Sequence, residues 1–323
     1  MTESGIACWL TGLMELRHIT AQEIRERLDI LGLIEALRSG HRGPAPDMER
    51  VLMTDDGNTY LVWHAWDPGN VVVTKMVTVF PSNPTLQPPV PSVQGVITAF
   101  DGATGRPLAV VDGTELTYWK TAASSGLAAD MLARADAVTL LMVGSGGLAP
   151  YLAMAHRAVR PTIERVLIWN RTMAKAEAMA EDPMIGPGAV VVTDLEAAVA
   201  EADIVSSATA SPTPLIHGRH VRPGTHLDLV GGFTPAMREA DDDAVTNARL
   251  FVDAAMFNVD HCGDLCQPIA AGLIARDAIA DLFDLCRGDR IGRESDEEVT
   301  LYKSGGGAHL DLMATVHTLG VTG

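Results

Sequence analysis

The alternation of apolar and polar residues divides the chain into regions of different character. Within residues 16–40, Thr20 and Glu23 have the spacing of a helix capping box, and apolar residues then recur every three or four positions until Gly40. This pattern predicts one amphipathic helix that stops at Gly40. Residues 50–113 instead contain β-branched runs separated by turn sequences such as DDG, DPGN and DGATG, which predicts a series of β-strands.

From residue 115 onward, apolar strands alternate with helices of about ten residues, the pattern of βαβ units in a parallel sheet. The run VTLLMV is uninterrupted, as expected for a strand that is buried on both faces. The last segment predicts a strand, a glycine turn and a helix. We therefore predict an α/β protein with a Rossmann-type, doubly wound domain over residues 122–304. The second domain is predicted to be α+β, over residues 1–121, rejoined by residues 305–323.

Composition narrows the class of protein without identifying its chemistry. The 323 residues are 47% hydrophobic and 20% charged, values typical of globular proteins, and suffice for about two domains. The net charge is 24 − 41 = −17, which argues against nucleic acids and anionic membranes as partners. No apolar run reaches the roughly 18 residues that cross a membrane, and the N-terminus lacks the basic start of a signal peptide. Four cysteines make no disulfide framework, so we expect a cytoplasmic protein.

The most specific local motif is a glycine-rich turn between the strand VTLLMV and an amphipathic helix. It has the form G-x-G-x-x-A and comprises Gly144, Ser145, Gly146, Gly147, Leu148 and Ala149. In such a motif the first glycine makes the tight turn, the second lets a pyrophosphate approach the backbone, and the small last residue lets helix and strand pack closely. The free N–H groups of the helix N-terminus then bind the anion. The motif predicts a dinucleotide site, with a glycine turn that binds no ligand as the alternative.

The end of the next strand bears on which dinucleotide binds. NAD-specific sites usually carry an acidic residue there, about 20 residues past the fingerprint, to bind the ribose 2′-hydroxyl. This chain has Asn170, Arg171 and Thr172 at that place and no acid. Because a guanidinium attracts a 2′-phosphate that a carboxylate would repel, we predict NADPH as the cofactor, with NADH as the alternative.

Three cations outside the doubly wound region are candidates for binding a small anionic substrate. Lys75 lies inside the apolar run VVVTKMVTVF, where a lysine costs stability unless it reaches solvent or a partner. Lys120 lies on a helix of small residues that would let a ligand approach, and Arg50 precedes the strand VLM. For each of the three, a solvated surface charge is the alternative.

Blocks of sequence in a fixed order resemble the ornithine cyclodeaminase/mu-crystallin family over residues 20–318. They are VTKMVTVFPSNP, PSVQGVITAFDGATGRPLAVVDGTELT, KTAASSGLAA, LLMVGSGGLAP, WNRT, ADIVSSAT, PGTHLDLVGGFTPAMREAD, CGDL and VTLYKSGGGAHLDL. The resemblance implies a homodimer whose N-terminal region, with the C-terminal helix, binds the substrate and forms the dimer contact. It also implies an inserted Rossmann domain. The family includes ornithine cyclodeaminases, alanine dehydrogenases, ketimine reductases and non-enzymatic binding proteins.

Compared position by position, the resemblance places a carboxylate-binding arginine at Arg50 and the active-site lysine at Lys75. The second carboxylate-binding arginine of the family falls on Lys120, which keeps the charge and loses the bidentate fork. The aspartate that handles the ornithine amines in cyclodeaminases falls on Phe233, which can neither transfer a proton nor counter an ammonium group. The sequence therefore most resembles the branch that reduces 1-pyrroline-2-carboxylate and 1-piperideine-2-carboxylate to L-proline and L-pipecolate.

The reaction implied by this resemblance is hydride transfer from nicotinamide C4 to the C2 carbon of a cyclic imine. Arg50, Lys75 and Lys120 would hold the substrate carboxylate, and Phe233 would form an apolar wall beside its ring. One of the two lysines would alternatively supply the imine proton, and both assignments stay open. The alternatives are an amino-acid dehydrogenase or imine reductase acting on alanine or iminosuccinate, an ornithine cyclodeaminase, and an NADPH-binding protein without turnover.

Further cofactor contacts are expected near the carboxyl ends of the predicted strands, where open α/β sheets bind their ligands. The resemblance places Thr209 and Gly231 against the cofactor. Lys303 and Ser304 begin a second glycine turn that would meet the nicotinamide side.

The remaining chemistry-bearing residues give weaker signals. His309, which follows that glycine turn, is a candidate proton donor. His261, Cys262 and Cys266 supply only three of the four ligands typical of a zinc site, so we predict no metal.

Overall fold

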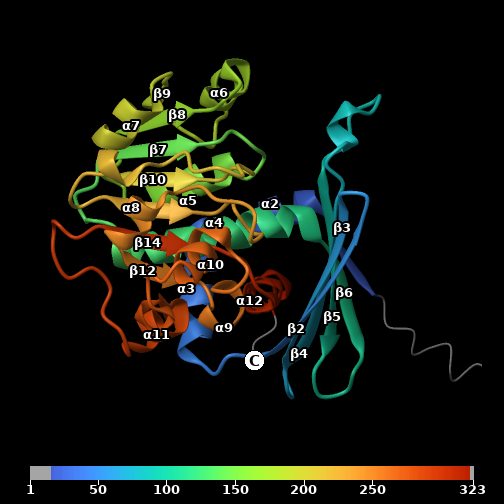
Figure 1. The fold of residues 1–323 in the computed structure, drawn as a ribbon. Helices are drawn as coiled ribbons and strands as arrows, with labels where there is room; N and C mark the ends of the chain where they lie inside the picture. The colour runs from blue at the N-terminus through green and yellow to red at the C-terminus, as the bar shows by residue number, and fades with distance from the viewer. Residues whose placement is uncertain (1–15, 321–323) are drawn as a thin grey trace, which may run out of the picture.

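A computed structural model describes residues 16–320 and contains two β-sheets with helices packed between and around them (Figure 1). The N-terminal residues 1–15, which carry Cys8 and on which the expectation about a signal peptide rests, lie outside the described residues. The other cysteines, Cys262, Cys266 and Cys286, are free. Within residues 16–320, no helix is long and apolar enough to cross a membrane.

The first sheet has six strands in the order β1-β6-β5-β4-β3-β2, and all neighbours except β1 and β6 are antiparallel. Its strands are β1 (Arg17–Ile19), β2 (Asp47–Asp55), β3 (Asn58–Asp67), β4 (Val71–Val79), β5 (Val93–Asp101) and β6 (Pro107–Asp112). The predicted turns DDG, DPGN and DGATG fall between consecutive strands of this sheet, which confirms the prediction of a β-rich region. Alternate residues of β4 are buried, so this sheet has one packed face and one open face.

The second sheet has eight parallel strands in the order β13-β12-β14-β11-β10-β7-β8-β9. They are β7 (Thr139–Val143), β8 (Arg165–Trp169), β9 (Ala189–Val191), β10 (Ile204–Ser207), β11 (His226–Leu229), β12 (Arg249–Val252), β13 (Ala280–Asp281) and β14 (Thr300–Lys303). Every residue of β7 is buried, as the apolar run VTLLMV predicted. The prediction of a Rossmann-type parallel sheet is confirmed.

Helices cover both faces of the parallel sheet (Figure 1). The helices that connect its strands are α5 (Ala149–Val159), α6 (Met173–Ala180), α7 (Leu195–Glu201), α8 (Asp242–Thr246), α9 (Ala255–Asn258), α10 (Gly263–Ala270) and α11 (Leu282–Arg287). Short 3₁₀ helices lie at Asn83–Thr85, Gly218–His220 and Arg276–Ala278.

The single helix predicted within residues 16–40 is two helices, α2 (Ala21–Arg27) and α3 (Ile30–Arg42). The predicted capping box of Thr20 and Glu23 is present. The helix breaks at Leu28, which is extended, because the side chain of Asp29 accepts a hydrogen bond from the backbone N–H of Gly32 at 2.7 Å and starts a new helix. Gly40 does not end α3.

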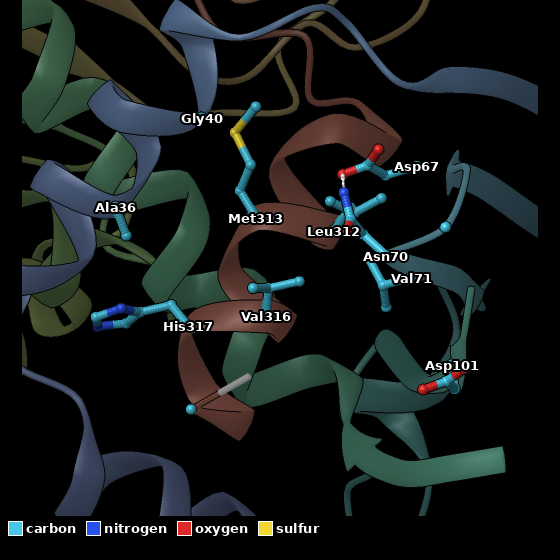
Figure 2. A pocket seen from close by; sticks show the side chains of 12 residues that line it. Ala36, Gly40, Asp67, Asn70, Val71, Asp101, Leu312, Met313, Val316 and His317 are labelled. Atoms are coloured by element: carbon cyan, nitrogen blue, oxygen red, sulfur yellow. Dashed lines mark hydrogen bonds between the residues drawn. The ribbon is translucent and has the colours of Figure 1, made fainter. Parts of the chain in front are cut away.

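Gly40 instead lets α3 approach α12 (Ala308–Leu319) closely (Figure 2). A Cβ atom on Gly40 would lie 2.6 Å from the sulfur of Met313, closer than real Cβ contacts occur. Helix α12 also packs against β3 and β4, so the end of the chain closes over the packed face of the six-stranded sheet.

The long helix α4 (Gly113–Leu132) joins the two sheets and is almost entirely buried. It is rich in small residues, which lets α3, α5 and α12 pack closely around it. The predicted domain boundary between residues 121 and 122 falls inside this helix. The division into domains therefore stays a prediction.

Candidate functional site

A cavity of about 420 Å³ lies between the packed face of the six-stranded sheet and the carboxyl edge of the parallel sheet. Residues from β2, β3 and β4 form one wall, and helix α4 lines the cavity between them and the parallel sheet. The opposite wall consists of the turns that follow β7, β10, β11 and β14, together with Asn258 and His261 from the segment after β12. These turns stand at the ends of neighbouring parallel strands, which is the place where open α/β sheets bind ligands.

The cavity brings together the predicted substrate-binding residues Arg50, Lys75, Lys120 and Phe233. Arg50 and Lys75 stand opposite Trp63 in the strand register, one on each side of it. The guanidinium of Arg50 lies over the Trp63 ring, 5.4 Å from its centroid. Lys75 and Lys120 are 6% and 2% exposed, so neither is a solvated surface charge.

Both lysines are held by one buried carboxylate that the sequence reasoning missed. Asp311 on α12 lies 2.8 Å from Lys75 Nζ and 3.5 Å from Lys120 Nζ, and is 1% exposed. An acid inside the apolar helix segment HLDLM should have indicated a buried partner, because an unpaired buried charge is costly. Burial lowers the pKa of Lys75 to about 8, and Asp311 opposes this effect.

The glycine-rich turn has the geometry that a diphosphate requires. Gly144 has a φ of 103°, and a Cβ on it would lie 2.8 Å from the carbonyl oxygen of Ala208. A Cβ on Gly146 would meet no atom within 4 Å, so its backbone is open to a ligand. Leu148 caps α5 without a side-chain hydrogen bond, and the buried hydroxyl of Ser145 has no protein partner. These features fit an anionic group at the start of α5.

Seven of the predicted cofactor contacts line the cavity. They are Gly146, Gly147, Leu148, Ala149, Thr209, Gly231 and Ser304. Tyr118 of α4 joins them, and its hydroxyl lies 2.9 Å from where a Cβ on Gly147 would be. No local motif marks Tyr118, because it meets Gly147 only through the fold and the two residues are far apart along the chain.

Asn170, Arg171 and Thr172 do not line the cavity and lie between β8 and α6. The side-chain amide of Asn170 donates to the backbone carbonyl of Thr172 at 2.9 Å, and Arg171 is exposed. The turn begins beside the glycine-rich turn, because the N–H of Gly144 donates a hydrogen bond to the carbonyl of Trp169, the last residue of β8, at 2.9 Å.

Lys303 lies behind the cavity rather than on its wall. Its ammonium is fully buried and donates to the carbonyl oxygens of Leu229, at 3.1 Å, and of Gly231. The carboxylate of Asp264 lies 3.4 Å away. This geometry does not favour the predicted direct contact with a cofactor.

His309 also lies away from the cavity wall, packed edge-on to His41 and against Phe283. Burial holds its pKa well below the usual range, which does not favour a role as proton donor. His261 lines the cavity. In the described part of the chain, no group of three or more His, Cys, Asp and Glu residues is placed to hold a metal ion.

A second cavity, of about 570 Å³, lies between α3, α12 and the turn that joins β3 to β4 (Figure 2). Its acids are already engaged: Asp67 accepts from the side chain of Asn70 at 2.9 Å, and Asp101 accepts from the N–H of Thr104 at 2.8 Å. None of the predicted site residues lines it. We therefore place the candidate site in the first cavity.

The fold and this site define a Rossmann-type α/β protein whose ligand cavity opens at the carboxyl edge of its parallel sheet. Residues 13–317 match the ornithine cyclodeaminase/mu-crystallin family, and the chain belongs to that family. It is 44% identical to Delta(1)-pyrroline-2-carboxylate reductase of Paracoccus denitrificans, over 89% of this chain and 91% of that protein.

Two solved structures of the same architecture carry ligands. Delta(1)-pyrroline-2-carboxylate reductase of Thermococcus litoralis, in complex with NADH and L-proline, is 27% identical with a TM-score of 0.87, covering 94% of this chain and 97% of that one. An archaeal alanine dehydrogenase dimer with bound NAD is 26% identical with a TM-score of 0.87, covering 95% and 96%.

Proposed function

We propose that the protein is an NAD(P)H-dependent reductase of cyclic imino acids. It converts 1-pyrroline-2-carboxylate or 1-piperideine-2-carboxylate into L-proline or L-pipecolate. The observation that carries this proposal is the meeting, in one cavity, of a glycine-rich turn with Arg50, Lys75 and Lys120. The similarity to pyrroline-2-carboxylate reductases, one of them solved with NADH and L-proline, supports the choice of reaction.

The proposed substrate is small and carries one carboxylate, which suits the cations on the wall. Arg50, Lys75 and Lys120 hold this carboxylate and so orient the ring. Trp63 and Phe233 are the apolar surfaces beside the ring. Phe233 offers no charge to a side-chain ammonium, which disfavours ornithine as a substrate.

A dinucleotide whose pyrophosphate is bound at the glycine-rich turn would supply, from its reduced nicotinamide, the hydride that C2 of the imine accepts. The protein's part is to hold C2 in line with the donor and to exclude water from the cavity. The imine nitrogen must also end the reaction protonated. Lys75 and Lys120 are the catalytic candidates, because their ammonium groups adjoin the place where the carboxylate, and therefore C2, would lie.

We further propose that NADPH is the preferred cofactor. Arg171 is exposed in the turn after β8, where its guanidinium would attract a ribose 2′-phosphate, and no acid occupies that turn. The solved relatives contain NADH and NAD, so this preference would distinguish the present chain from them.

We also propose a homodimer formed through the open face of the six-stranded sheet. The described helices pack on the other face (Figure 1). On the open face Val51, Met53 and Trp66 are 45%, 60% and 50% exposed, and such an apolar surface is typical of a protein contact. The partner is a second copy, as in the dimeric alanine dehydrogenase.

The proposed function is tested by following NADPH oxidation with 1-pyrroline-2-carboxylate and 1-piperideine-2-carboxylate. We expect turnover with at least one of them and no ammonia release from ornithine. Turnover restricted to iminosuccinate, or to pyruvate with ammonia, would replace this function with that of another imino- or amino-acid enzyme. Tight NADPH binding without any turnover would indicate a binding protein.

A further inference from the structure

A buried carboxylate holds the turn that follows β10 from behind the cavity. Oxygen Oε1 of Glu239 accepts from the hydroxyl of Ser207 at 2.6 Å. It also accepts from the backbone N–H of Thr209 at 2.7 Å and from its hydroxyl at 2.8 Å. Glu239 and Ser207 are fully buried and do not line the cavity, whereas Thr209 does. Glu239 therefore acts on the cavity wall through another residue.

The same carboxylate also supports the neighbouring turn, after β11. A Cβ on Gly231 would lie 1.9 Å from the carbonyl oxygen of Thr209 and 2.7 Å from Oε1 of Glu239, so these groups are tightly packed. Lys303 donates to the carbonyl of Gly231 from behind. Asp264 holds the backbone of Glu239, because its Oδ1 accepts from the Glu239 N–H at 2.8 Å.

We propose that Glu239 is a positioning residue for the dinucleotide, which shapes the two turns after β10 and β11 on which the nicotinamide half rests. Lys303 and Asp264 complete this buried cluster and place the Glu239 carboxylate. The inference rests on the proposed function only in requiring that a dinucleotide binds at the glycine-rich turn. It gives Lys303 an indirect role in place of the direct contact predicted from sequence.

The cluster makes dinucleotide affinity depend on pH. Burial raises the pKa of Glu239 to about 7, against the lowering effects of Lys303 and of the Ser207 hydroxyl. The other groups facing the cluster are the carboxylate of Asp264 and the thiol of Cys262, whose pKa burial raises to about 12. Below pH 7 Glu239 therefore becomes neutral, and its three hydrogen bonds to Ser207 and Thr209 weaken, because a neutral acceptor binds donors less strongly than an ionised one.

The test is the dissociation constant of NADPH and of NADH, measured by calorimetry on the full chain at about pH 6 and about pH 8, either side of the Glu239 transition. In the wild-type protein we expect affinity to fall about tenfold from the higher pH to the lower one. Glu239→Gln is neutral at both pH values and should bind about as weakly at both as the wild type binds at the lower pH. Glu201→Gln, an exposed glutamate at the end of α7, is the matched control and should behave as the wild type.

A second variant keeps the inference testable if Glu239→Gln does not fold. Ser207→Ala removes one hydrogen bond to the ionised form of Glu239, so the pH midpoint of dinucleotide binding should move upward. A merely structural role would lower affinity equally at all pH values. That result, or unchanged affinity in both variants, would overturn the inference.

The outcomes for the two proposals are separable. If NADPH and NADH bind with the expected pH dependence and no imino acid is reduced, the proposed function is wrong and the role of Glu239 stands. If imino acids are reduced and Glu239→Gln binds both dinucleotides normally, the proposed function stands and the role of Glu239 is wrong. If the wild type binds neither dinucleotide, both proposals are wrong.

Discussion

Replacing Asp311 by Asn removes the only negative charge that contacts Lys75 and Lys120 in the described residues while keeping the shape of the side chain. Unit charges 2.8 Å apart, the distance from Asp311 to Lys75, attract by about 6 kcal/mol at an effective dielectric constant of about 20. Removing one partner of a buried pair typically costs about 3–5 kcal/mol after relaxation. We use the lower value, about 3 kcal/mol, which corresponds to about two pH units in the pKa of Lys75.

The direction of the effect follows from the charge of lysine. The pKa of Lys75 is about 8 in the wild type, so the ammonium that we propose to hold the substrate carboxylate is present below this pH and is lost above it. Without Asp311 the charged form is less stable, and the ammonium is lost about two pH units lower. At neutral pH the variant would then hold its substrate with one cation fewer.

The assay is kcat/KM for reduction of 1-pyrroline-2-carboxylate from about pH 5 to about pH 9. We expect the alkaline decline of Asp311→Asn to begin about two pH units below that of the wild type. Asp289→Asn, on the exposed turn after α11, is the control and should leave the profile unchanged. An alkaline limb at the wild-type position, or a uniform loss of activity at every pH, would refute the assigned coupling between Asp311 and Lys75.

Other predictions concern the cofactor, the dimer and acid stability. Arg171→Ala should weaken NADPH by about tenfold (roughly 1.4 kcal/mol) and leave NADH binding unchanged, and equal losses for both would contradict the 2′-phosphate contact. Trp66→Asp should give monomers in analytical ultracentrifugation, because it places a charge in the proposed apolar contact, and a stable dimer would exclude that face. Burial lowers the pKa of His41 to about 4, so the unfolded chain takes up the proton first and stability is lost as pH falls from 6.5 towards 4. His41→Phe should therefore remove about 2 kcal/mol of the stability difference between pH 6.5 and pH 5 in urea unfolding, and an unchanged difference would be the contrary result.

The sequence was sufficient to predict those parts of the fold and site whose residues are neighbours along the chain. The run VTLLMV and the glycine-rich turn lie next to each other along the chain, and the structure places them as predicted. The first helix was predicted without its break, because the pattern of apolar residues continues through Asp29. A capping side chain there starts a new helix without changing that periodicity.

The electrostatics of the site could not be predicted in the same way. Lys75 and Asp311 are 236 residues apart, and only the folding of α12 onto the six-stranded sheet brings them together. Lys303 was selected for its place beside a glycine turn, and its side chain points behind the wall, towards Leu229 and Gly231. Sequence position indicated which strand ends line the cavity, and side-chain direction decided which charges reach it.

We expect hydride to pass from a reduced nicotinamide to C2 of a cyclic imino acid held by Arg50, Lys75 and Lys120. The most direct test supplies the reduced nicotinamide cofactor with deuterium at both C4 positions, together with 1-pyrroline-2-carboxylate, and locates the label in the product by NMR. We expect L-proline that carries deuterium at C2. Absence of proline, or proline without the label at C2, would contradict it.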